Sequence, residues 1–529
     1  MSSRRAQPAV VLVADRTLAA NYRVLFEGMF ATMQTTQVPQ FVMRRLLAPR
    51  VRTDRAGRAR SVPVGLRRVE AALVDHAGLD PADVVCTTPE TLPKLLGPWT
   101  KIVGVTSGDP LGRGMSNTTT AHFWKGELYS RFWTRKMMQT LRRAKRRHGF
   151  RVVFGGGGAW QWRVQPGEAQ DAGIDTVFEG YFEAEGPPLF REMLAGKTPP
   201  AHRAARGTAG DAIRPIRGAS LLGSVELSRG CGRGCRFCTM ARQPMHHLPA
   251  ETILADLETN VSAGVTSVVS GSEDLFRYGA RGPRPNFEAL RALLTEMKRI
   301  DGLGFMQIDH GNVATVAQLS DAELAEIRRL LTWRRRNDYL WVNMGVESAN
   351  GELVRRVAAG KLVPFAADEW EAVVRDVADK MARAGFFCVF SVILGLPGET
   401  PQDVDRTRRL VEDLTAGPAL VFPVFYEPLP HELAAGARRF TLEEMTAEHL
   451  ALFTTCYEVN FKKVPRLYWD NQRAGGVSWF KRALLQALGR TEVVSWRKRF
   501  RRIGEGIAAR TAAAEPPQRR ATAPAAGSP

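Results

Sequence analysis

Residues 228–238 read SRGCGRGCRFC, a stretch that places Cys231, Cys235 and Cys238 in the spacing C-x3-C-x2-C. It directly follows residues 224–227, SVEL, whose alternation of polar and apolar residues predicts a strand. Three thiolates on one short loop can bind three irons of a cubane cluster, and the interspersed glycines let the backbone wrap around it. Because no fourth ligand is adjacent, one iron would stay open for a substrate. The stretch therefore predicts a four-iron, four-sulfur cluster.

A zinc site is the alternative for the same cysteines, with His246 or His247 as the fourth ligand. Zinc motifs usually present cysteines as two C-x2-C pairs, so the spacing favours iron over zinc. A redox-active thiol cluster without metal is favoured less. The other three cysteines lie among apolar residues and are predicted to be core thiols: Cys86, Cys388 and Cys456.

The composition is that of a protein with packed cores. The chain has 529 residues, of which 44% are apolar, and this length predicts two or three domains. The longest apolar run, 386–396, is about half the length of a membrane-spanning helix. The N-terminal apolar run is too short for a signal peptide. We therefore expect a cytoplasmic protein with no membrane partner, in which cysteines stay reduced.

The net charge of +20 is concentrated in basic runs at 142–147, 334–336 and 497–502. Such runs can mark nucleic-acid binding, but no nucleic-acid motif accompanies them. Solvated helix faces are the favoured interpretation, so nucleic acid is not expected as a partner. Attraction of anionic substrates is a weaker expectation.

Two parts of the chain alternate strand-like and helical patterns, which predicts an α/β fold. In residues 8–196 the strands are short buried runs, typical of a doubly wound parallel sheet in a Rossmann-like domain: 9–14, 84–87, 102–106 and 152–154. In residues 220–430 repeated βα units predict a parallel partial barrel, with its chemistry at the C-terminal strand ends. Residues 197–219 predict an exposed linker, 431–510 a helical region, and 511–529 a disordered tail.

Residues 220–430 resemble the radical S-adenosylmethionine (SAM) superfamily. The cysteine motif of that family has an aromatic residue before its last cysteine, and Phe237 fills this place. Its Gly-Gly-Glu motif is matched by residues 271–273, its G-x-E-S motif by 345–348, and its G-L-P-G-E-T turn by 395–400. The resemblance implies SAM contacts from Gly271, Ser272, Glu273, Glu347, Ser348 and Gly395.

The chemistry implied by this resemblance is radical chemistry. SAM would bind the open iron, Glu273 would accept a hydrogen bond from its ammonium group, and Gly395 would lie beside the adenine. An electron from a donor such as flavodoxin or ferredoxin would pass through the cluster into SAM and release a 5′-deoxyadenosyl radical.

An α/β domain in front of such a barrel resembles the cobalamin-dependent branch of the superfamily. A strand here ends in a glycine run, and residues 175–180 resemble the D-x-V-x-x-G strand of that branch. Ligands of such sheets bind outside the carboxyl ends of the strands. We therefore predict cobalamin contacts from Ser107, Asp109, Gly155, Gly156, Gly157 and Gly158.

The cobalt-ligating histidine of many cobalamin domains, in a D-x-H-x-x-G motif, is missing here. Asp75 and His76 have the wrong spacing for it, so cobalamin would bind without this ligand. The alternative is a degenerate domain with a structural role.

Candidates on the substrate side are fewer. Asp309 and His310 follow the third predicted strand of the barrel, where they could act with Glu273 in catalysis as acid, base or orienting groups. A structural role is the alternative for a lone histidine. Tyr278, Trp160 and Trp162 could line a pocket.

The resemblance implies methylation of an unactivated carbon of a small-molecule substrate. An oxidative cyclase, or another radical rearrangement without net methyl transfer, shares the architecture. A methylthiotransferase acting on transfer RNA shares the barrel alone. Outside enzymes, an iron-sulfur electron carrier and an RNA-binding protein are the alternatives.

Overall fold

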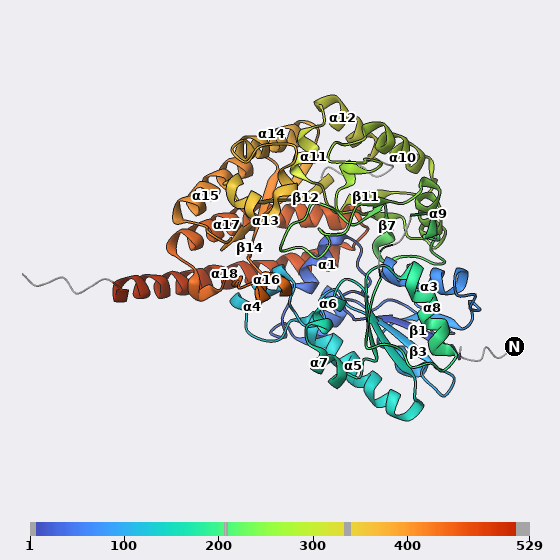
Figure 1. Cartoon of the computed structure of the whole chain (residues 1–529). Coiled ribbons are helices and arrows are strands. Elements are labelled where there is room, and N and C mark those ends of the chain that lie inside the picture. The colour runs from blue at the N-terminus through green and yellow to red at the C-terminus, as the bar shows by residue number, and fades with distance from the viewer. Residues whose placement is uncertain (1–6, 206, 208–209, 333–339, 515–529) are drawn as a thin grey trace, which may run out of the picture.

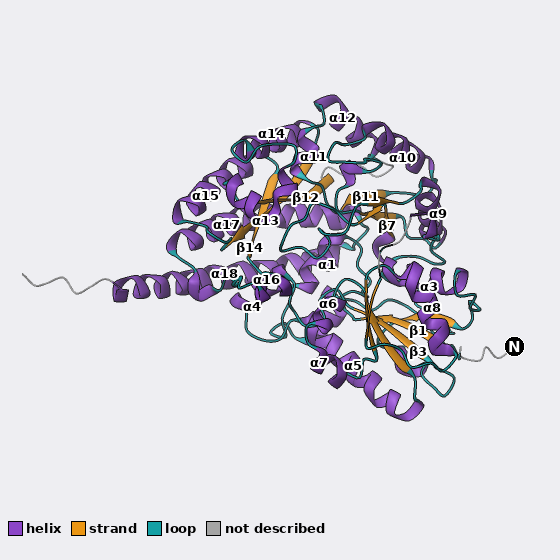
Figure 2. Cartoon of the chain, viewed as in Figure 1, coloured by secondary structure: helices purple, strands orange, loops and turns teal. Residues whose placement is uncertain are grey.

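The structure is a computed structural model that describes residues 7–205, 207, 210–332 and 340–514 (Figure 1). Two separate parallel sheets form its frame, one in the N-terminal part and one in the middle of the chain (Figure 2). Helices cover both, which confirms the predicted α/β class. The basic run at 334–336 lies outside the described residues.

The N-terminal sheet has the order β2-β1-β3-β4-β5-β6, and all its strands are parallel. Its strands are β1 (Val10–Ala14), β2 (Val84–Thr87), β3 (Ile102–Thr106), β4 (Arg151–Gly155), β5 (Thr176–Glu179) and β6 (His202–Ala204). The strand order reverses between β1 and β3, as in doubly wound folds. Alternate residues of β1 enter two cores, one on each face of the sheet. Helices α3 (Val64–Asp75) and α8 (Phe182–Leu194) pack on one face and α5 (Tyr129–His148) on the other (Figure 1).

Strand β6 corrects one predicted boundary. It lies inside 197–219, the expected linker, and pairs in parallel with β5, so the sheet continues to Ala204. All three residues of β6 are exposed, and such an edge strand has no apolar run by which the sequence could reveal it.

The central sheet is a six-stranded parallel partial barrel. Two three-stranded sheets, β7-β10-β11 and β12-β13-β14, are joined by a parallel bridge between His310 and Asn343. The strands are β7 (Ser224–Glu226), β10 (Ser267–Gly271), β11 (Phe305–Ile308), β12 (Leu340–Glu347), β13 (Phe386–Leu394) and β14 (Ala419–Phe425). Strand β14 was not predicted from the sequence, since it contains Pro423 and proline is unfavourable in most strands. It lies at the edge of the sheet, where a proline leaves no neighbouring strand without a hydrogen-bond donor.

Helices enclose the barrel from outside, with α9 (Ala250–Ser262), α10 (Phe287–Arg299), α12 (Asp321–Leu330), α14 (Trp370–Arg383) and α15 (Pro401–Ala416) forming the outer ring (Figure 1). The C-terminal region is helical, as predicted, with α17 (Ala447–Ala474) and α18 (Trp479–Ala514). Helix α18 runs through 511–514, which corrects the predicted start of the disordered tail; residues 515–529 lie outside the described residues. Trp496 of α18 packs on Phe123 of α4 (Met115–Phe123), so α18 holds the two parts of the chain together. No helix within the described ranges is both long and apolar enough to cross a membrane.

Buried ion pairs join the N-terminal domain to the barrel. Arg68 of α3 bonds to Glu226 of β7 at 2.7 Å and to Asp256 of α9. Arg229 bonds to the same Glu226 at 2.9 Å and to Glu183 of α8 at 2.8 Å. Although burial disfavours its charged form, Glu226 has its pKa lowered to about 2 by the two arginines. The N-terminal domain and the barrel are therefore joined by ion pairs in which Glu226 stays ionised.

We expect Arg68→Met to destabilise the fold. The substitution leaves Asp256 and Glu226 short of a buried counter-charge, at a cost of about 3 kcal/mol. Urea unfolding measures the loss, with Arg143→Met at an exposed position of α5 as the control, expected within about 0.5 kcal/mol of the parent. Equal stability of the two variants would contradict a structural role for this network.

Candidate functional site

The three predicted cluster ligands lie on one loop at the mouth of the barrel. This cysteine loop, residues 228–247, begins with β8 (Ser228–Arg229) and ends with β9 (His246–His247), which pair as antiparallel strands. Gly230 has a φ of +74°, and a Cβ there would lie 2.2 Å from the Pro244 carbonyl oxygen. Only glycine allows this crossing of the two ends of the loop.

The thiols are shielded from solvent but are not arranged for one ion. Burial raises the pKa of all three, to about 11 for Cys235. Within the described ranges, no three His, Cys, Asp or Glu side chains converge as the ligands of a single metal ion do. Three thiols on one short loop are the donor set that a cubane cluster with one open iron needs. His247 donates from Nε2 to the Ala280 carbonyl oxygen at 2.9 Å, which fixes the orientation of its ring.

Arg233, inside the cysteine loop, fixes the loop to the barrel. Its buried guanidinium donates to Thr315 Oγ1 at 2.5 Å, to Asp274 Oδ2 at 3.3 Å and to the Gly360 carbonyl oxygen at 2.9 Å. A Cβ on Gly360 would lie 2.3 Å from the Arg233 carbonyl oxygen, so the helix that carries Gly360 presses directly on the loop. Sequence reasoning missed this arginine because its partners are distant in the chain.

The structure brings together the three predicted catalytic residues. Glu273 follows β10, and Asp309 and His310 follow β11, where His310 Nδ1 lies 3.0 Å from Asp309 Oδ1. Burial raises the pKa of Glu273, and the charges of His310 and Asp309 also act on it. Although burial opposes a charged imidazole, Asp309 raises the pKa of His310 to about 9. His310 thus pairs with Asp309 at the mouth of the barrel and lies within electrostatic reach of Glu273.

Glu347 is paired with a lysine that sequence reasoning missed. It ends β12 with a φ of +66°, and its carboxylate accepts a hydrogen bond from Lys361 of α13 (Gly351–Leu362). Both side chains are buried. A lysine near the end of an amphipathic helix looks like a surface residue in the sequence, so only the structure reveals it.

Two predicted SAM contacts also have structural roles, and their contact with SAM stays a prediction. Ser348 is buried and lies 3.3 Å from Thr407 Oγ1. Ser272 is also buried and shares a hydrogen bond of 2.5 Å with Ser228, which ties β10 to the cysteine loop. Gly271 allows the close approach of β10 to β7, since a Cβ there would lie 3.2 Å from the Val225 carbonyl oxygen. Phe237 is half-buried and packs against the barrel core.

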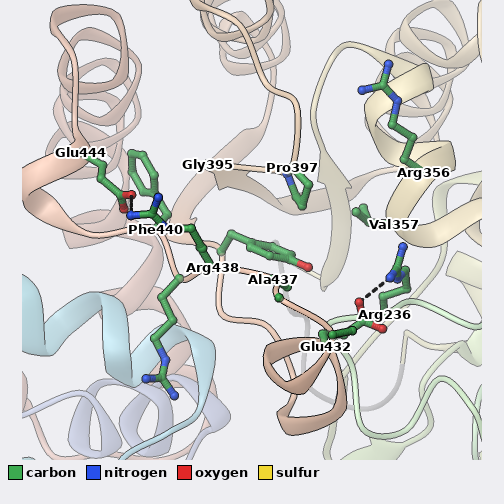
Figure 3. Close-up of a pocket in the computed structure, with 14 residues that line it drawn as sticks. Arg236, Arg356, Val357, Gly395, Pro397, Glu432, Ala437, Arg438, Phe440 and Glu444 are labelled. Atoms are coloured by element: carbon green, nitrogen blue, oxygen red, sulfur yellow. Dashed lines mark ion pairs between the residues drawn. The ribbon is translucent and has the colours of Figure 1, made fainter.

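The predicted adenine turn lines a cavity of about 660 Å³ at the barrel mouth (Figure 3). Gly395 there has a φ of +80° and donates its backbone N–H to Glu399 Oε2 at 2.6 Å. Arg236 of the cysteine loop reaches across this mouth cavity and pairs with Glu432 at 2.6 Å (Figure 3). The turn and the cysteine loop thus form walls of one cavity.

A second cavity, of about 490 Å³, lies between the two domains. One wall is the carboxyl edge of the N-terminal sheet, with Gly155, Gly156, Gly157 and Trp160; the other is the cysteine loop around Cys238. Four polar residues also line it: Tyr181, Glu183, Arg229 and Gln243. The walls of this interdomain cavity therefore combine glycines and apolar side chains with polar and charged ones.

The other predicted cobalamin residues do not line this cavity. Asp109 accepts hydrogen bonds from Asn117 Nδ2 at 2.5 Å and Gln161 Nε2 at 2.6 Å, and so organises its own loop. Ser107 is fully buried, and a Cβ on Gly158 would lie 2.5 Å from its carbonyl oxygen. Ser107, Asp109 and Gly158 thus have partners within their own loop and do not line this cavity, and their contact with cobalamin stays a prediction. Trp162 and Tyr278 are likewise buried in cores.

Comparison with known proteins now identifies the central part of the chain. Residues 225–411 match the family described as the Radical SAM superfamily. These residues are a radical SAM domain. Since that family uses a four-iron, four-sulfur cluster and SAM, the prediction of these two cofactors and of a radical SAM enzyme is confirmed.

Two curated relatives share this domain. The chain is 30% identical over 196 residues to the ribosomal protein uS12 methylthiotransferase RimO of Oleidesulfovibrio alaskensis, covering 36% of this chain and 41% of the relative. It is 23% identical over 243 residues to the tRNA-2-methylthio-N(6)-dimethylallyladenosine synthase of Bordetella petrii, covering 45% and 47%. The chain thus spans less than half the length of these relatives.

Two solved structures share the fold over most of the chain. Both are the radical SAM methyltransferase TsrM from Kitasatospora setae. One has cobalamin and a [4Fe-4S] cluster bound, with 15% identity, a TM-score of 0.53, and coverage of 81% of this chain and 75% of that one. The other has tryptophan and a SAM analogue bound, with 14% identity, a TM-score of 0.54, and coverage of 81% and 76%. The likeness includes the N-terminal domain and shows the fold alone.

We expect His310 to titrate near pH 9 in the folded protein. The folded pKa lies above the ordinary value of 6.5, so its stabilising effect is complete below pH 6.5 and is lost as the pH rises through 9. NMR titration of the imidazole signals measures this pKa, and Asp309→Asn should lower it. A His310 pKa near the ordinary value of 6.5, unchanged in Asp309→Asn, would contradict the ion pair.

Proposed function

We propose that this radical SAM enzyme also binds cobalamin and methylates an unactivated carbon of a small molecule. The observation that carries the proposal is the interdomain cavity, whose walls are the glycine run of the N-terminal sheet and the cysteine loop. A ligand in this cavity would lie directly beside Cys238. Cobalamin in the cavity and SAM on the cluster would then lie on two sides of the cysteine loop. Such proximity is required if cobalamin is to give its methyl group to a radical that SAM generates.

The residues at the mouth of the barrel suit the cluster and SAM. Cys231, Cys235 and Cys238 would hold the cluster, Glu273 would accept from the SAM ammonium group, and the turn at Gly395 would lie beside the adenine. When bound, the cluster and SAM supply a 5′-deoxyadenosyl radical and cobalamin carries the methyl group. The protein keeps water away and sets the geometry.

The interdomain cavity suits a corrin ring, which is broad, apolar and fringed with carboxamides. Gly155, Gly156 and Gly157 carry no side chain and let a flat ring approach the sheet edge; a Cβ on Gly157 would meet no atom within 4 Å. Each carboxamide can both donate and accept. Among the lining residues, Arg229 and Tyr181 carry donors and Glu183 and Gln243 carry acceptors that would suit such a fringe.

The cavity also extends beyond the sheet edge. Leu12, Gly104 and Val153 from three neighbouring strands line this apolar extension, which is suited to the nucleotide tail of cobalamin.

A methylthiotransferase is the second candidate, because both curated relatives carry that name. Sulfur insertion requires a sulfur donor, and a second cluster as donor needs several cysteines. Outside the cysteine loop the sequence has only three, Cys86, Cys388 and Cys456. Each is buried, and burial raises the pKa of each thiol. This favours methyl transfer over sulfur insertion.

The working environment of the enzyme follows from its cluster. A reduced cluster needs a low-potential electron donor such as flavodoxin or ferredoxin, and we place the enzyme in the reducing cytoplasm where such donors occur. A small-molecule substrate would enter through the mouth cavity.

Reconstitution tests the proposal. Protein purified without oxygen and supplied with iron, sulfide and hydroxocobalamin should hold about four irons and one cobalamin per chain. With SAM and reductant it should form 5′-deoxyadenosine and S-adenosylhomocysteine, and Cys235→Ala should abolish both. Cobalamin without S-adenosylhomocysteine would favour the oxidative cyclase. A cluster without cobalamin would remove the assignment of the N-terminal domain, and zinc in place of iron would overturn the proposal.

We expect Tyr181→Phe to weaken cobalamin binding about three- to tenfold, the effect of one lost hydrogen bond. Tyr181 lines the interdomain cavity, and the variant removes only its hydroxyl, so the fold of the apoprotein should be kept. Tyr278→Phe is the matched control, since that hydroxyl donates to the Leu248 carbonyl oxygen away from the cavity. Equilibrium dialysis measures both; equal affinity of Tyr181→Phe and the parent would contradict the placement.

A further inference from the structure

We infer that Lys361 is the fixed positive charge of the cluster site, a positioning residue that holds Glu347 and raises the reduction potential of the cluster. The inference rests on the proposed role of Cys231, Cys235 and Cys238 as cluster ligands. It concerns neither cobalamin nor the substrate, so it can be tested apart from them.

Lys361 is buried in the protein interior. It is 9% exposed, and its ammonium group bonds to the carboxylate of Glu347. A Cβ on Gly345 would lie 2.4 Å from Lys361 Nζ and 2.2 Å from Glu347 Oε1. The ion pair therefore packs directly over the backbone of β12. Burying a lysine costs free energy of folding unless its charge is paired. A lysine at this position therefore indicates a role inside the protein and not at its surface.

The lysine and the cysteine loop belong to one rigid unit. Arg233 Nη1 donates to the Gly360 carbonyl oxygen at 2.9 Å, and the Arg236 backbone N–H donates to the Val357 carbonyl oxygen at 2.8 Å. Gly360, the neighbour of Lys361, leaves no room for a side chain against the loop. The last turn of α13 thus places the ammonium group at a set position relative to the cysteines.

The ammonium group lies close to the middle of the cysteine loop. The loop residues on either side of Cys235, Arg233 and Arg236, bond to the helix that carries Lys361. The positive charge of Lys361, held inside the protein by Glu347, acts on the sulfur of Cys235. A charge shielded from water in this way acts strongly on a group bound by that cysteine.

A positive charge near the cluster affects how easily the cluster is reduced. One electron passes from a low-potential donor of the flavodoxin or ferredoxin class into the oxidised cluster; no bond forms or breaks, and the cluster with its three thiolates becomes more negative by one charge. A fixed cation in a shielded site stabilises the more negative form. Lys361 thus makes the cluster easier to reduce, and it offsets Glu273 and Glu347 near the same site.

The test is a redox titration of cluster-reconstituted protein, followed by electron paramagnetic resonance, without cobalamin or substrate. In Lys361→Met the ratio of reduced to oxidised cluster at a fixed potential should fall about tenfold, a shift of about 59 mV for one electron. Lys361→Gln, which keeps a donor for Glu347 and so protects the fold, should shift it in the same direction. Lys361→Arg keeps the charge and should keep the potential.

Lys380→Met is the matched control, because Lys380 of α14 is also partly buried and paired, with Asp376, but lies on the outer ring. Its potential should equal that of the parent. A parent-like potential in Lys361→Gln, or equal shifts in the Gln and Arg variants, would overturn the inference and leave a structural role. Failure of the parent to hold an iron cluster would instead overturn the proposed function.

Discussion

The guanidinium of Arg229 is the interaction on which the arrangement of the site depends. It stands two residues before the first cysteine, bonds to Glu183 of the N-terminal domain and Glu226 of the barrel, and lies 4.6 Å from the ring centre of Tyr181. Because its charge is fully compensated only when both domains are in place, the start of the cysteine loop is fixed by domain docking. The loop is thus a wall shared by the mouth cavity and the interdomain cavity, and a change in the docking would alter both.

Much of the barrel could be predicted from the sequence because its signals are local. Short apolar runs mark buried strands, and the cysteine spacing, together with Glu273 and the turn at Gly395, follows those strands directly. Asp309 and His310 were placed by the same reasoning, since the residue after a barrel strand lies at its mouth. For these residues the preceding strand determines where they lie in the fold, so contacts with distant parts of the chain need not be known.

The parts that escaped prediction depend on partners far apart in the chain. Lys361 looks like a surface lysine until β12 places Glu347 beside it. In the sequence Asp109 looks like a ligand-binding carboxylate. In the structure Gln161, 52 residues later, donates a hydrogen bond to one of its oxygens. Polar residues at strand ends suit a ligand and a loop equally well, and only the three-dimensional hydrogen bonds separate the two roles.

The charges at the barrel mouth follow a single pattern of compensation. Asp309 pairs with His310 at the half-open mouth, Glu273 lies within electrostatic reach of the same histidine, and the buried Glu347 is paired with Lys361. The barrel alone does not fix the reaction, because the curated methylthiotransferases share it. Beyond the barrel, this chain has a cavity between the N-terminal sheet and the far side of the cysteine loop. In the proposed function, the ligand of this interdomain cavity would select the reaction, while the barrel would supply the radical.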